Sequence, residues 1–309
     1  MTIAAVWVRT LSSGAEELVF CSDSRLSGQG ARFDQGQKTF RLSRTDAAIC
    51  FAGGTHWAYP MVVAAINAVD VHIPSKTRAL GLPQFKNHLL NILNQMQREV
   101  HNFVTGENIP NVTFLFGGYD SWTKCFRIWR LKFDEIGGRF VAEERGGSNG
   151  FGGLGKIEIA GDPEWTEVVR ERLKVLTQSR YGLNMREPET SRFNWEPFEV
   201  IRDLVRATDP NISIGGAVQL VKVYQYLNST DVGVFWPNIH SKQIYLGGRP
   251  LQPYEKAFIK SILEPDALVS TWANGGIEEA LASMARALTT ARDRESELDS
   301  DISEQILNE

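Results

Sequence analysis

The first 55 residues contain four short segments, each of a length that is typical of a β-strand, and all but the third are mainly apolar. They cover 2–8, 18–22, 38–42 and 47–55. A turn is expected between the first two at Ser12-Ser13-Gly14, because small residues and glycine favour chain reversal. The beginning of the chain is therefore predicted to form β-structure, with its first strand buried.

Longer stretches with helical spacing follow. Residues 56–71 have helical character, and residues 82–103 carry apolar side chains on one side of a predicted amphipathic helix. Pro163 begins a further helical stretch, in which 164–176 are amphipathic, and 196–207 forms another that ends before Asp209-Pro210. These stretches predict two pairs of helices.

Further strands are expected on both sides of the second helix pair. The predicted strands are 112–116, 126–133, 139–143, 156–160, 218–226 and 232–236. Turns are expected at Gly117-Gly118-Tyr119-Asp120 and at Gly137-Gly138. The order of strands, two helices, strands, two helices and strands predicts an α+β fold.

Composition narrows the class of protein. The chain has 309 residues, a net charge of −4 and no basic patch, so nucleic acid is not an expected partner. Its three cysteines are too scattered for a disulfide framework, and there is neither a secretory signal nor an apolar run long enough to span a membrane. The five histidines lack metal-ligand spacing. We expect a cytoplasmic protein without a metal or other cofactor.

Thr2 is the strongest candidate for chemistry. Removal of Met1 would give it a free α-amine, which can accept the proton of the threonine hydroxyl directly or through one water. An α-amine with a pKa of about 8 is a better base near neutrality than a lysine at about 10. A threonine at the start of a strand is also common in proteins without such chemistry, so this interpretation depends on the residues that follow.

Three motifs follow in order: Asp23-Ser24-Arg25 after the second strand, Lys38, and Ala52-Gly53-Gly54 before the first helix. With Thr2, they make the chain resemble the proteasome β-type branch of the N-terminal-nucleophile hydrolases, including the heat-shock-locus ring peptidase and the ancestral-β-subunit proteins. The resemblance implies that Thr2 is the nucleophile and that Asp23 orients Lys38. It implies that Lys38 lowers the pKa of the amine and the hydroxyl, and that the Gly53 amide binds the oxyanion.

The same resemblance implies a four-layer αββα sandwich over residues 2–253, followed by a helical extension with a charged tail over 254–309. In that extension, 255–263 and 276–291 are expected to be helical. Relatives assemble as closed or open helical rings, so a homo-oligomer and a peptide or protein substrate are expected. The sequence leaves open whether an ATPase or other regulatory partner exists.

Four positions are expected by resemblance to line a pocket beside the nucleophile: Leu26, Phe40, Phe51 and Thr55. Three are apolar and none is charged. A charged substrate side chain would be desolvated there without a partner, at a cost of several kcal/mol. The pocket residues therefore predict cleavage after hydrophobic residues.

The accessory part of the implied site departs from the family pattern. Asp162 stands where the family carries a serine near the nucleophile and is a candidate to bind the terminal amine. Residues 211–220 resemble a family segment in which Asn211 and Ile214 replace an aspartate and a serine, so that Asp209 and Ser213 become candidate substitutes.

Two alternative functions follow from the start of the chain. Aligning Ile3 with the isoleucine of the family's opening Thr-Thr-Ile puts Met1 at the nucleophile position. In that register the protein is a catalytically inactive ring-forming or scaffold subunit. A small-amide hydrolase on the same scaffold is the second alternative.

The glycine-rich segment 150–156 satisfies a loose dinucleotide spacing and most of a phosphate-binding loop. However, Ile157 follows Lys156 and cannot bind magnesium. Residues 156–160 alternate as a strand, whereas a phosphate-binding loop opens a helix. We expect a glycine-rich connection here and no nucleotide.

Overall fold

The structure is a computed structural model that describes residues 2–11, 13–28, 31–100, 110–145, 155–181, 193–207, 213–226 and 228–268. The chain divides into two compact units, Met1–Leu263 and Glu264–Glu309. The first unit combines antiparallel sheets with several helices, as expected for an α+β fold. Of the second unit only the first five residues are described, and the expected helix 276–291 and charged tail lie outside the described residues.

The larger sheet has eight strands and contains both ends of the first unit. Its main order is β10-β1-β2-β11-β12-β13-β14, with β15 paired to β12. The strands are β1 Ile3–Thr10, β2 Glu16–Ser22, β10 Ile157–Gly161, β11 Gln219–Tyr224, β12 Asn228–Phe235, β13 Ile244–Leu246, β14 Arg249–Pro250 and β15 Ile262–Leu263. All pairs are antiparallel except β12 with β15.

The smaller sheet is antiparallel throughout and has the order β5-β6-β7-β8-β9. Its strands are β5 Thr39–Arg41, β6 Ala47–Gly53, β7 Val112–Asp120, β8 Cys125–Asp134 and β9 Arg139–Glu144. A separate hairpin of β3 Leu26–Gly28 and β4 Ala31–Phe33 follows β2.

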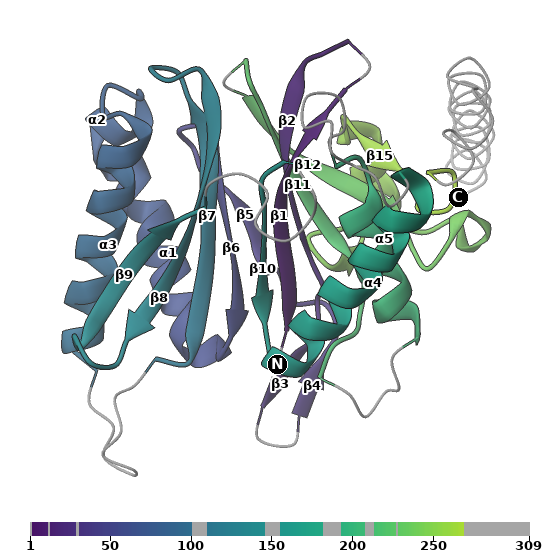
Figure 1. Cartoon of the computed structure of the whole chain (residues 1–309), viewed down its shortest axis with the longest axis horizontal. Helices are drawn as coiled ribbons and strands as arrows, with labels where there is room; N and C mark the ends of the chain where they lie inside the picture. The colour runs from purple at the N-terminus through teal and green to yellow at the C-terminus, as the bar shows by residue number, and fades with distance from the viewer. Residues whose placement is uncertain are drawn as a thin grey trace, which may run out of the picture. The chain divides into compact units, whose positions relative to one another are not determined.

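The helices cover outer faces of the two sheets (Figure 1). Helix α1 Thr55–Val71, the short α2 Ile73–Lys76 and α3 Leu82–Arg98 lie beside the five-stranded sheet, while α4 Pro163–Tyr181 and α5 Glu196–Ala207 lie beside the larger one. Two short 3₁₀ helices, η1 Ile239–Ser241 and η2 Pro253–Phe258, complete the described elements. No helix among the described residues is long and apolar enough to cross a membrane.

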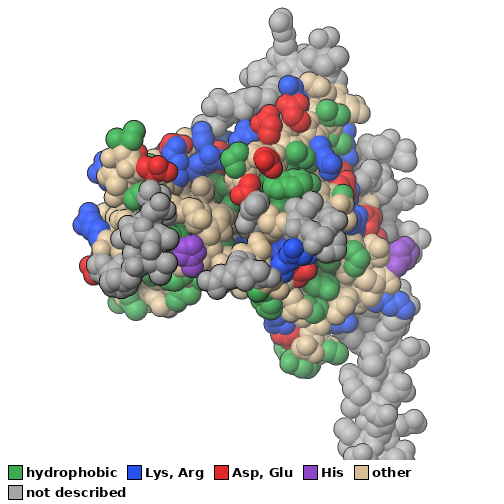
Figure 2. Space-filling view, turned by 90° about the horizontal axis from the view of Figure 1, so that it is seen from below, with side chains coloured by type: hydrophobic (Ala, Val, Ile, Leu, Met, Phe, Trp, Pro, Cys, Tyr) green, Lys and Arg blue, Asp and Glu red, His purple; other side chains and the backbone are tan. Residues whose placement is uncertain are grey.

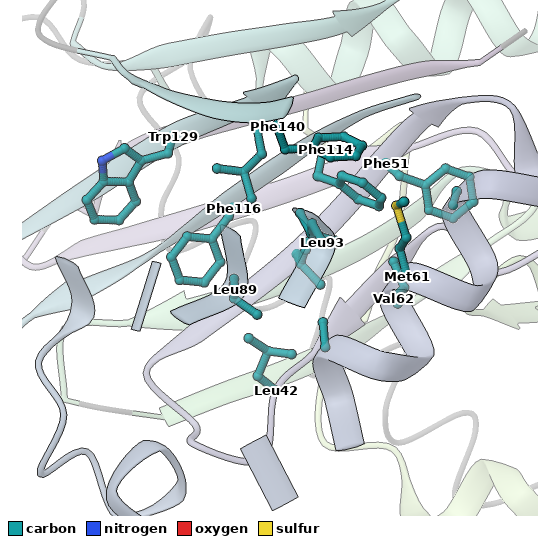
Figure 3. Packing of buried hydrophobic residues seen from close by; sticks show 14 of the residues in the cluster. Leu42, Phe51, Met61, Val62, Leu89, Leu93, Phe114, Phe116, Trp129 and Phe140 are labelled. Carbon is teal, nitrogen blue, oxygen red and sulfur yellow. The ribbon is translucent and has the colours of Figure 1, made fainter. Parts of the chain in front are cut away.

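Two apolar clusters among the described residues hold the two sheets and helices α1 and α3 together. One lies between α1, α3 and the five-stranded sheet, where Phe51, Phe114 and Phe116 pack against helix side chains such as Met61 and Leu93 (Figure 3). The other combines inward-facing residues of both sheets, including Val6 and Phe20 of the larger sheet and Cys50 of the smaller one. The faces of the two sheets therefore share a core, and burial of that core stabilises their packing.

The predicted turn at Gly117-Gly118-Tyr119-Asp120 is wrong, because β7 continues through all four residues and pairs with β8. Glycine is required in this strand for a packing reason. A Cβ on Gly117 would meet Leu18 of the other sheet, and one on Gly118 would meet the backbone of Asp46. The close approach of neighbouring chains, and not a chain reversal, explains both glycines.

The expected helix at 255–263 is found only over 255–258, as part of a 3₁₀ helix. Pro253 begins the 3₁₀ helix η2, which ends at Phe258, and Ile262–Leu263 then pair in parallel with Gly233 and Val234 of β12. The sheet edge offers these residues backbone partners that a helix would not use. Residues 254–263, expected in the extension, thus contribute a strand to the first unit.

Figure 2 shows the face of the molecule seen from below Figure 1, the end at which β1 begins. Basic, acidic and apolar side chains are interspersed over the described part of this face. Charge of one sign does not dominate it.

Candidate functional site

Thr2, Asp23 and Lys38 come together where three segments of the chain meet. Thr2 directly precedes β1, Asp23 directly follows β2, and Lys38 directly precedes β5. The antiparallel pairing of β1 with β2 places Ala4 opposite Ser22, so the start of one strand and the end of the other coincide. Strand geometry therefore brings the predicted nucleophile next to the predicted carboxylate.

The Lys38 ammonium links the other two residues. Its Nζ donates to Thr2 Oγ1 at 2.8 Å and to Asp23 Oδ1 at 2.9 Å. Thr2 is 1% exposed, and Lys38 and Asp23 are 0% exposed. In such a low-dielectric environment an ammonium stabilises a developing alkoxide on Thr2 far more strongly than it would in water.

Asp23 is held from several directions. Its Oδ1 also accepts from the Ile3 amide at 3.2 Å, and its Oδ2 accepts from the Arg25 and Gly215 amides, each at 3.2 Å. Three backbone donors and one ammonium thus stabilise the charged carboxylate. This arrangement explains how two opposite charges are tolerated without exposure to water.

Burial lowers the pKa of Lys38, while the charge of Asp23 and its hydrogen bond act to raise it, as does the charge of Asp162. The ammonium therefore depends on the carboxylate beside it. Without Asp23, burial would favour the neutral amine.

Gln219 connects the segments that carry Asp23 and Lys38, and it was not among the residues selected from the sequence. Its side-chain oxygen accepts from the Lys38 and Thr39 amides at 2.9 and 3.2 Å, and its nitrogen donates to the carbonyls of Asp23 and Gly36 at 2.9 and 3.0 Å. It lies on β11, opposite Ser22 of β2. The only available signal was a polar residue at the start of a largely apolar strand.

Gly53 ends β6, and Gly54 forms the cap before α1. Gly53 has a φ of +112°, and a Cβ on it would meet the backbone oxygen of Asn111. Both the conformation and the close approach require glycine at this position. This local requirement is independent of the oxyanion role that the resemblance implies for the Gly53 amide.

The four predicted pocket residues lie in different elements. Phe40 of β5 and Phe51 of β6 stack with ring centroids 6.5 Å apart, and Tyr59 of α1 packs edge-on against both. Phe51 is fully buried and belongs to the core, whereas Phe40 is half-buried. Thr55 is the first residue of α1, and Leu26 of β3 packs against Gly36.

The three accessory candidates, Asp162, Ser213 and Asp209, differ in where they lie relative to Thr2 and Asp23. Asp162 directly follows β10, whose Gly161 pairs with Ile3, so Asp162 lies beside Thr2 in the strand register. Ser213 shortly precedes Gly215, which donates to Asp23, and the Ser213 Oγ is buried with no hydrogen-bond partner in the described part of the chain. Asp209 and Asn211 lie outside the described residues.

Residues 150–154 of the glycine-rich segment are likewise outside the described residues, but the segment that follows is informative. Ile157–Gly161 form strand β10, and the Lys156 ammonium donates to the carbonyl of Phe126 at 2.7 Å. A phosphate-binding loop requires a helix after its lysine. The observed strand agrees with the expectation that this segment is a connection between strands.

No model of a known protein family matches the chain, and no curated protein matches it significantly in sequence. Within the described ranges, there is also no cluster of three or more histidine, cysteine, aspartate or glutamate side chains suited to a metal ion.

Proposed function

We propose that the protein is an N-terminal-threonine amide hydrolase, a peptidase similar to the proteasome β-type enzymes, and that its layers form their four-layer αββα sandwich. The observation that carries this proposal is the buried Lys38 ammonium, which bridges the Thr2 hydroxyl and the Asp23 carboxylate. The arrangement of helices outside two packed sheets supports the sandwich (Figure 1).

The proposed reaction begins after Met1 is removed, which leaves a free α-amine on Thr2. Thr2 Oγ1 attacks the carbonyl carbon of the substrate amide, and its proton passes to that amine directly or through one water. Lys38 stabilises the negative charge that develops on Oγ1, and the Gly53 amide is proposed to bind the oxyanion on the substrate.

Collapse of the tetrahedral intermediate breaks the carbon–nitrogen bond. The leaving nitrogen takes the proton from the Thr2 ammonium, and an ester joins the substrate acyl group to Oγ1. The amine then accepts a proton from a water molecule that attacks the ester, and it returns the proton to Oγ1 as the acid is released. Protons and electrons balance over the cycle without a cofactor.

The test combines intact-mass analysis with activity of matched variants. We expect the purified protein to lack Met1, to cleave fluorogenic peptide amides, and to lose this activity in Thr2→Ala while Thr2→Ser retains part of it. A mechanism-based electrophile should add one adduct per chain, and peptide mapping should locate it on Thr2. Retention of Met1 together with no turnover would instead favour the inactive ring-forming or scaffold subunit, and undiminished turnover by Thr2→Ala would contradict the mechanism.

A further inference from the structure

Asp162 carries a carboxylate oxygen that has no role in the steps of the proposed reaction. Its Oδ2 is buried and has no hydrogen-bond partner among the described residues. A buried carboxylate oxygen without a donor costs free energy, so its retention calls for a partner that binds there.

The strand register places Asp162 beside Thr2. Ile3 pairs with Gly161, which continues β1 and β10 toward Thr2 on one strand and Asp162 on the other. Gly161 has a φ of +155°, and a Cβ on it would meet the Thr2 carbonyl oxygen. The backbone at Gly161 therefore lies against Thr2, and glycine allows Asp162 to follow at this short range.

Other charged groups surround Asp162. The Lys38 ammonium and the carboxylates of Asp23 and Glu164 all interact with it, from the segment before β5, the end of β2 and the first turn of α4. Burial raises the pKa of Asp162, the positive charge of the chain's N-terminus lowers it, the carboxylates of Asp23 and Glu164 raise it, and Lys38 lowers it. Lys38 donates its hydrogen bonds to Thr2 and Asp23, and Oδ2 of Asp162 has no hydrogen-bond partner among the described residues, so this oxygen can accept from a second cation.

We propose that Asp162 is a positioning residue whose carboxylate binds the free α-amino group of mature Thr2 and holds it beside the threonine hydroxyl. This inference rests on the proposed function, because only removal of Met1 puts an α-amine on Thr2. In the mature chain the amine lies between two opposite influences: Lys38 favours its neutral form, and Asp162 favours its protonated form. Asp162 therefore tunes the base as well as orienting it.

The sign of the effect follows from this balance. The proposed base must be neutral to accept the hydroxyl proton, so activity declines as pH falls through the pKa of the amine. Removing the Asp162 charge lowers that pKa, and the acid limb of the pH–rate profile then moves to lower pH. We expect a shift of about one pH unit in Asp162→Asn, since a neighbouring opposite charge changes a pKa by about 1–3 units.

The experiment uses the full-length protein and the variants Asp162→Asn and Glu164→Gln. Glu164→Gln is the matched control, because it removes a nearby negative charge from a residue with no proposed contact to Thr2. Two readouts are needed: the pH–rate profile with a fluorogenic peptide, and the pKa of the Thr2 α-amine from NMR of protein labelled with ¹⁵N-threonine.

A lower amine pKa and a matching acid-limb shift in Asp162→Asn, with little change in Glu164→Gln, would support the proposal. An unchanged amine pKa in a folded Asp162→Asn, or an equal shift in both variants, would overturn it. Absence of turnover by the unmodified protein would count against the proposed function, whereas the NMR measurement on a chain that lacks Met1 still decides the role of Asp162.

Discussion

Lys38 Nζ lies 2.8 Å from Thr2 Oγ1, although 36 residues separate the two along the chain. The contact is fully buried, and the same ammonium donates to Asp23. Side chains from the start of β1, the end of β2 and the start of β5 thus form one hydrogen-bonded group.

Lys38→Met should abolish peptide cleavage while the protein remains folded. Methionine preserves much of the side-chain volume but removes the cation that would stabilise the Thr2 alkoxide, so we expect kcat to fall by at least about 100-fold. Initial rates and circular dichroism measure the two properties. Lys222→Met is the matched control, because Lys222 is also largely buried and paired with an acid, Glu17, which retains Arg9 as a partner. Equal loss of activity in both variants would contradict a specific role for Lys38.

Asp23→Asn should lower the free energy of unfolding at pH 7 by about 3–5 kcal/mol, because it leaves the Lys38 ammonium buried without its counter-charge. Burial already lowers the pKa of Lys38, and loss of Asp23 lowers it further. Between that folded-state pKa and the unfolded value of about 10.4, the unfolded chain binds more protons, so stability rises with pH.

Urea denaturation at pH 7 and at pH 9.5 therefore should show partial recovery of stability in Asp23→Asn at the higher pH. Asp34→Asn serves as the control. The Asp34 side chain is 48% exposed where it pairs with Arg25, and its loss should cost about 1 kcal/mol or less. A stability deficit of Asp23→Asn that is the same at both pH values would argue against the charge explanation.

Gln219→Leu should destabilise the site through the backbone. It leaves the Lys38 and Thr39 amides and two carbonyls without their side-chain partner, and each buried unsatisfied group costs about 1–3 kcal/mol. We expect a loss of about 3 kcal/mol or more by chemical denaturation. Gln225→Leu, which removes a single partly buried hydrogen bond to Glu16, should cost much less, and similar losses in the two variants would show that Gln219 has no special role.

Peptides that place leucine or tyrosine at the cleaved carbonyl should be better substrates than peptides with arginine or glutamate there. The reason is that the implied pocket residues carry no charge to pair with the substrate. Phe40→Ala should reduce kcat/KM for the leucine peptide. Phe133→Ala is the control and should not reduce it, because Phe133 is also a partly buried aromatic residue but packs on Phe140. Preferred cleavage after arginine or glutamate would show that other residues line the pocket. Phe51 is less useful for this test, because its truncation would cost about 3–5 kcal/mol of core packing.

Local sequence patterns determined most elements of this protein. The sequence predicted the apolar run after Thr2, the helices α1, α3, α4 and α5, and the strands β6, β8 and β11. Each of them shows either the regular spacing of apolar residues expected of an element with one buried face, or the continuous apolar run expected of an element buried on both faces. The candidate residues Thr2, Asp23 and Lys38 were also identifiable in sequence, through resemblance and order. The resemblance also implied that Asp23 orients Lys38, whereas the distances and the burial of this contact are properties of the tertiary structure.

Only the tertiary structure decided how these elements meet. Three features depend on partners that are distant in sequence: the role of Gln219, the strand conformation of Gly117-Gly118, and the pairing of β15 with β12. The local spacing of apolar and polar residues contains no information about such partners. The same holds for Asp162, which lies beside Thr2 because β10 pairs with β1 across about 150 residues of chain, and whose Oδ2 has no hydrogen-bond partner among the described residues. Sequence specifies which side chains can do chemistry here, whereas strand register and burial determine which of them share a charge environment.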